Sequence, residues 1–74
     1  MNPPLHPLFP DAHRRLLVAD MGRALVEGNI DLGDERAAII CLRRTHREGD
    51  VLALLDDAIC WAREMMAALA RPGG

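Results

Sequence analysis

Several residue types are missing from this sequence. It contains no Ser, Tyr, Lys or Gln, so all nine basic residues are Arg. The absence of Ser, Tyr and Lys removes three side chains that often act as nucleophiles or as general acids and bases. The adjacent carboxylates of Asp56 and Asp57 diverge by about 100° on a helix and do not form a catalytic pair. We therefore expect that the protein is not an enzyme.

Aromatic and β-branched residues are also few. Phe9 and Trp61 are the only aromatic residues of the chain. β-Strands are enriched in these two residue classes, so a sheet is not expected. The composition predicts an all-α fold. It is rich in Ala, Arg, Leu and Asp, which is typical of a GC-rich bacterial genome or of one of its mobile elements.

The chain has two cysteines, Cys41 and Cys60, and they form no CxxC motif. A metal site would have to be assembled from residues such as His13, His46 and a cysteine, which follow no zinc-ligand spacing. We therefore expect two free thiols, no metal and no cofactor.

No long apolar run is present. Asp56-Asp57 and Arg63-Glu64 interrupt the best candidate, and the N-terminus lacks a basic segment followed by an apolar one. A cytoplasmic protein without a signal peptide or a membrane span is therefore expected. The formal net charge of −2 predicts no general attraction to nucleic acid or to anionic lipid.

Prolines divide the chain. Residues 1–10 hold four of the five prolines and are predicted to form an extended arm. Its apolar residues Leu5, Leu8 and Phe9 are expected to pack on their own domain or on a neighbouring subunit, with a docking motif as the alternative. Residues 11–71 are then a single helical domain, and residues 72–74 are a tail that should fray.

Three helices are predicted within this domain. The first spans residues 11–27, with Asp11 as its cap and Gly28-Asn29 as its stop. The second spans residues 35–47, is capped by Asp34 and ends at Gly49. Its apolar stripe is formed by Ala38, Ile39, Leu42 and the methyl group of Thr45. Because the link to the third helix is short, the last two helices are expected to form a helical hairpin.

The third helix is predicted to span residues 50–71, with Asp50 as its N-cap. Its apolar residues cover an arc of roughly 200°, whereas a surface helix needs a stripe of about 100°. A chain of 74 residues buries little apolar surface by itself. We therefore expect a homodimeric helical bundle or a higher oligomer. The predicted interface residues are Leu52, Leu55, Ile59, Ala62, Met66 and Leu69.

Four arginines cluster around Ile40 on the second predicted helix: Arg36, Arg43, Arg44 and Arg47. They form a candidate site for an acidic protein partner, although a merely solvated face gives the same pattern. The last two helices do not resemble a DNA-binding helix-turn-helix. The helix that would enter the groove begins with Asp50 and continues as VLALL, which has no side chain that could hydrogen-bond to base edges.

These patterns favour a small protein–protein interaction module. We expect a homodimeric regulator or inhibitor that binds a macromolecular partner. One alternative is a nucleic-acid-binding regulator that uses the arginines of the second helix. A second alternative is a small-molecule or metal binder.

Overall fold

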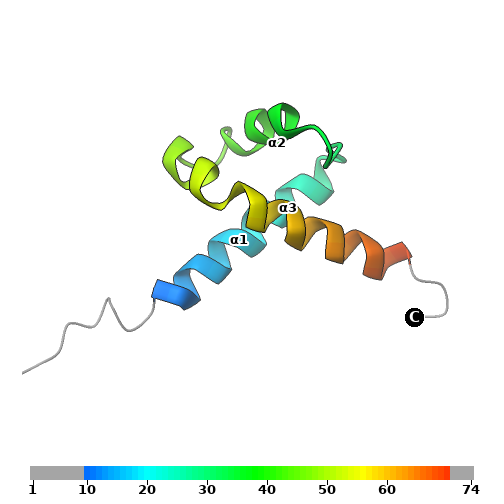
Figure 1. The fold of residues 1–74 in the computed structure, drawn as a ribbon, viewed down its shortest axis with the longest axis horizontal. Coiled ribbons are helices and arrows are strands. Elements are labelled where there is room, and N and C mark those ends of the chain that lie inside the picture. The colour runs from blue at the N-terminus through cyan, green and yellow to red at the C-terminus, as the bar shows by residue number, and fades with distance from the viewer. Residues whose placement is uncertain (1–9, 71–74) are drawn as a thin grey trace, which may run out of the picture.

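The computed structural model describes residues 10–70, which form three α-helices (Figure 1). They are α1, Pro10–Glu27; α2, Glu35–Leu42; and α3, Glu48–Ala70. Within this range there is no β-strand, so the all-α prediction is confirmed. None of the described helices is both long and apolar enough to cross a membrane.

Helix α1 begins at Pro10, one residue earlier than predicted. Pro10 belongs to the first turn of α1 and Asp11 lies inside that turn instead of preceding it. Proline suits this position because the first backbone N–H groups of a helix have no partner within the helix. Residues 1–9, which include Leu5, Leu8 and Phe9, and residues 71–74 lie outside the described part of the chain.

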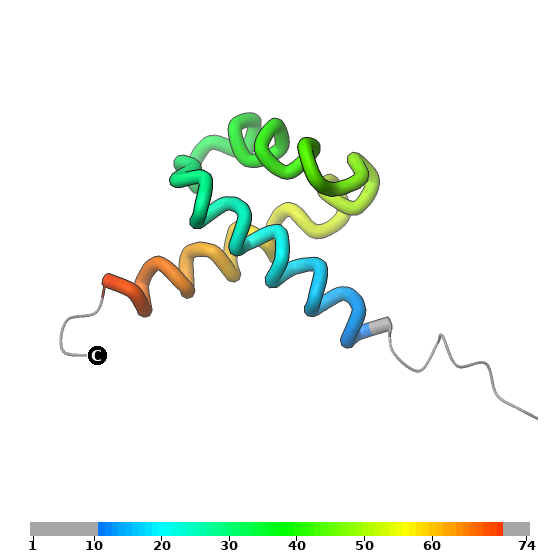
Figure 2. The backbone as a smooth tube through the Cα atoms, turned by 180° about the vertical axis from the view of Figure 1, so that it is seen from behind, coloured from blue at the N-terminus to red at the C-terminus, as the bar shows by residue number. Residues whose placement is uncertain are grey.

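The helices α1 and α3 cross near their middles, and α2 lies to one side of the crossing (Figures 1 and 2). The main packing partner of α1 is α3, although α2 is closer in sequence. Helices α2 and α3 run in roughly opposite directions and are joined by residues 43–47 (Figure 1).

All three helices contribute to the core. Met21 and Leu25 on α1 are completely buried. The other buried apolar residues within residues 10–70 are Ala38 and Leu42 on α2, and Val51, Leu55, Ala58, Ile59 and Ala62 on α3. Ile30 and Leu32, from the loop after α1, pack against this core.

The end of α1 follows its sequence. Asn29 has a φ of 55°, in the left-handed region that Asn tolerates better than most residues. The Ile30 N–H donates to the Leu25 carbonyl at 3.1 Å and the Asn29 N–H donates to the Val26 carbonyl at 3.0 Å. This pair of bonds is a Schellman motif, which satisfies carbonyl groups that the helix end leaves free.

The start of α2 also agrees with prediction. Asp34 occupies the N-cap position and its Oδ1 accepts a hydrogen bond from the Ala37 N–H at 3.1 Å. The end of α2 does not agree, because the helix stops at Leu42 instead of Arg47. Thr45 is therefore exposed, and the prediction that its methyl group joins the apolar stripe was wrong.

A side-chain contact explains the early end of α2. The imidazole of His46 lies 3.0 Å from Asp20 Oδ2 on α1 through Nε2, and 2.9 Å from Thr45 Oγ1 through Nδ1. The His46 side chain is nearly buried. Thr has a lower helix propensity than most residues, and Asp20 contacts His46 from another helix. The chain turns at residues 43–47 and brings His46 against α1.

Helix α3 starts two residues earlier than predicted, at Glu48. The prediction of Asp50 as its N-cap was wrong, since Asp50 lies in the first turn and the Val51 N–H already bonds to the Arg47 carbonyl at 2.9 Å. Gly49 belongs to this turn as well and does not terminate α2. Glu48 and Asp50 still favour the helix, because negative charge near an N-terminus complements the helix dipole.

Candidate interaction surfaces

The predicted oligomer interface divides into two groups of residues in the structure. Leu55, Ile59 and Ala62 are buried in the core of their own chain. The other three remain exposed by 59 % (Leu52), 42 % (Met66) and 71 % (Leu69). Only this second group offers apolar surface to another molecule.

The exposure of Leu69 results from the length of α3. Leu69 follows Val51 by about five helical turns, so the two residues lie on the same face of the helix. Val51 is completely buried, whereas the C-terminal end of α3 extends away from α1 and α2 (Figures 1 and 2). The face of α3 that forms the core therefore continues past the part that α1 and α2 cover.

A second surface lies on α2. Ile40 is 54 % exposed, and together with Arg43 and Arg44 it lines a shallow hollow of about 270 Å³. Arg36 precedes Ile40 by one helical turn on the same face. We call Arg36, Ile40, Arg43 and Arg44 the arginine surface. Arg47, predicted as part of the cluster, is exposed at the end of the 43–47 segment, directly before α3.

The charges of the arginine surface are poorly compensated. Arg43 Nη2 lies 3.7 Å from Glu48 Oε1, and both side chains are more than half exposed. Such exposed pairs contribute little to stability. Within residues 10–70, no carboxylate lies within ion-pair distance of Arg36, Arg44 or Arg47. Most of the positive charge here is thus free to meet a ligand.

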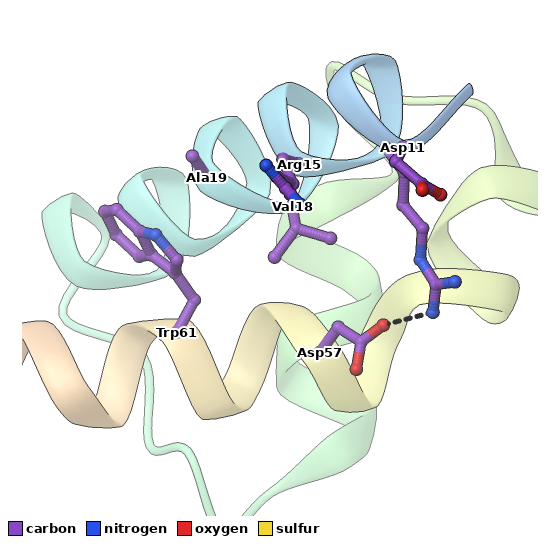
Figure 3. Close-up of a pocket in the computed structure, with 7 residues that line it drawn as sticks. Asp11, Arg15, Val18, Ala19, Asp57 and Trp61 are labelled. Carbon is purple, nitrogen blue, oxygen red and sulfur yellow. Dashed lines mark hydrogen bonds and ion pairs between the residues drawn. The ribbon is translucent and has the colours of Figure 1, made fainter. Parts of the chain in front are cut away.

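A wedge between α1 and α3 forms a third feature (Figure 3). Its volume is about 620 Å³, and its lining residues are Asp11, Arg14, Arg15, Val18, Ala19, Asp57 and Trp61. Arg14 Nη2 bonds to Asp57 Oδ2 at 2.6 Å across the wedge. This ion pair connects α1 to α3 at the wedge.

Sequence reasoning missed the pair that spans the wedge. Neither Arg14 nor Asp57 was predicted to contribute to the packing of the helices. The spacing did contain a signal, because Arg14 precedes Leu17, Val18 and Met21 by three, four and seven residues. These intervals place Arg14 on the core-facing side of α1.

Within residues 10–70, the cysteines and histidines have separate surroundings. Cys41 and Cys60 are both free thiols. The Cys41 thiol lies 3.9 Å from the Ala24 carbonyl, and Cys60 is exposed with Glu64 Oε2 at 3.8 Å. His13 is exposed on α1, while His46 bonds to Asp20. In the part of the chain that the structure describes, no three His, Cys, Asp or Glu residues gather as metal ligands.

No protein-family model matches the chain, and neither a curated protein nor a solved structure matches it.

Proposed function

We propose that this chain is a protein–protein interaction module that self-associates as a homodimer through α3. One observation carries the proposal: the core-forming face of α3 continues to Leu69, where no other part of residues 10–70 covers it. Met66 lies on the flank of the same exposed end, and Leu52 lies on that flank two heptads earlier. A second copy that packs along α3 would cover all three side chains. A two-fold contact of this kind is the commonest way in which soluble proteins assemble.

Burial of the exposed apolar side chains of α3 acts against the entropic cost of association. A large apolar side chain contributes roughly 1.5–3 kcal/mol when it is fully removed from water. Two copies supply six such side chains, and association costs about 4–15 kcal/mol in lost freedom.

The choice of substitution decides what an experiment can show. Ile59 belongs to the core of its own chain, so Ile59→Asp would unfold the monomer and report nothing about assembly. Leu69→Asp and Met66→Asp change exposed positions and should leave the fold intact. We expect these variants to sediment as folded monomers in analytical ultracentrifugation, whereas the unchanged chain sediments as a dimer. Helical content is checked by circular dichroism.

Leu16→Asp is the matched control. Leu16 is 71 % exposed, as Leu69 is, but it lies on α1 and points away from the core. This variant should remain dimeric. The proposal is wrong if the unchanged protein sediments as an 8.2 kDa monomer at tens of micromolar. It is also wrong if Leu16→Asp dissociates the assembly and Leu69→Asp does not.

A further inference from the structure

The arginine surface combines poorly compensated positive charge with an apolar centre. Ile40 lines two hollows. The first is the hollow that it forms with Arg43 and Arg44, and the second has a volume of about 290 Å³. The second hollow is lined by Gly28, Ile30, Ala37, Ile40, Cys41 and Arg44. Arg44 borders both hollows. An apolar side chain that entered the second hollow would thus lie beside Arg44.

We propose that this surface binds an acidic amphipathic segment of a partner protein. An aliphatic or aromatic side chain of that segment occupies the hollow beside Ile40. Its Asp or Glu residues pair with Arg44 and Arg36, whose planar guanidinium groups match the geometry of a carboxylate. Apolar anchors at the centre and charged groups at the rim are the usual arrangement of a peptide-binding surface. The proposal does not depend on self-association through α3.

The composition of the surface favours protein over nucleic acid. Proteins that bind single strands stack bases on aromatic side chains, and the arginine surface contains none. The charged phosphate groups of a nucleic acid would gain nothing from contact with the exposed Ile40 or with the hollow lined by Ile30, Ala37 and Cys41.

Binding of designed peptides tests the proposal. The probe is a fluorescein-labelled helical peptide with Leu on one face and Glu on the other. Three comparison probes are the same peptide with Lys in place of Glu, the same peptide with Ser in place of Leu, and a DNA duplex. Fluorescence anisotropy with the full chain should give saturable binding of the Leu–Glu peptide. Affinity for each comparison probe should be at least about tenfold weaker, a difference of about 1.4 kcal/mol.

Substitutions in the chain then locate the site. Arg44→Glu and Ile40→Ser should each weaken binding of the Leu–Glu peptide by about tenfold or more. Arg23→Glu is the control, because Arg23 is also an exposed arginine but lies on α1. It makes the same change in net charge and should leave the affinity within about twofold. Circular dichroism establishes that every variant keeps its helical content.

Three results would overturn the proposal. The first is the absence of saturable binding of the Leu–Glu peptide at about 100 μM, the level expected of even a weak specific contact. The second is an equal loss of affinity in Arg23→Glu and Arg44→Glu, which would show that only net charge matters. The third is tighter binding of the DNA duplex that falls steeply with salt, which would assign the surface to nucleic acid.

Discussion

Trp61 on α3 lies directly against the backbone of Gly22 on α1. A Cβ atom at position 22 would come within 2.9 Å of the indole Cδ2 and within 3.2 Å of the Ala58 carbonyl oxygen. Glycine inside a helix costs about 1 kcal/mol relative to alanine. The close approach of α1 and α3 explains why this residue is nevertheless present at the crossing.

Replacing Gly22 should therefore destabilise the protein. Gly22→Ala gains about 1 kcal/mol in helix propensity, but overpacking against the indole costs roughly 1–3 kcal/mol. We expect a lower free energy of unfolding in urea and a shift in the fluorescence of Trp61, the only Trp of the chain. Protein concentration is held fixed, because self-association alters apparent stability.

Gly49→Ala is the matched control for this experiment. Gly49 also lies in a helix, yet nothing stands within 4 Å of a Cβ built there. This variant should be neutral or more stable by up to about 1 kcal/mol. If Gly22→Ala were stabilised as much as Gly49→Ala, the tight crossing at Trp61 would be disproved.

The left-handed residue at the end of α1 gives a second prediction. Asn29→Ala should lower the free energy of unfolding by roughly 1–2 kcal/mol, because Ala tolerates a φ of 55° poorly. Asn29→Gly should change it by only a few tenths of a kcal/mol. Urea denaturation of both variants measures the difference. Equal stability of the two would contradict the Schellman geometry.

A third prediction concerns the thiols. Titration of the denatured, unreduced protein should count two thiols per chain, since Cys41 and Cys60 are not joined. In the folded protein Cys60 should react first, because it is exposed and Cys41 is half-buried. The Cys60→Ala variant should retain only the slow reaction. A count of zero in the denatured chain would refute this prediction.

Local chemistry explains which elements were predictable. The Schellman stop at Asn29 and the cap at Asp34 depend on residues close in sequence, and both were located in advance. The end of α2 was not, because it depends on the contact between His46 and Asp20, which are 26 residues apart. No local pattern encodes that contact.

The candidate surfaces were predictable only in outline. The spacing of apolar residues predicted the wide apolar arc of α3. It did not predict which helix covers each part of that arc. In the structure, α1 and α2 cover Leu55 and Ile59, while Leu69 lies beyond their reach. The clustering of arginines around Ile40 could be predicted from the sequence. The adjoining hollow could not, because it is lined by Ile30, whose position depends on the turn at Asn29.

The packing of α1 on α3, in preference to its neighbour α2, has a consequence for the folding rate. Residues 28–47 separate the two helices, so their docking must close a loop of about 20 residues at an entropic cost of roughly 3 kcal/mol. With only eight residues, α2 is too short to persist alone in water. The rate-limiting step should therefore be a non-local encounter of the first and last helices, with α2 ordering as they meet.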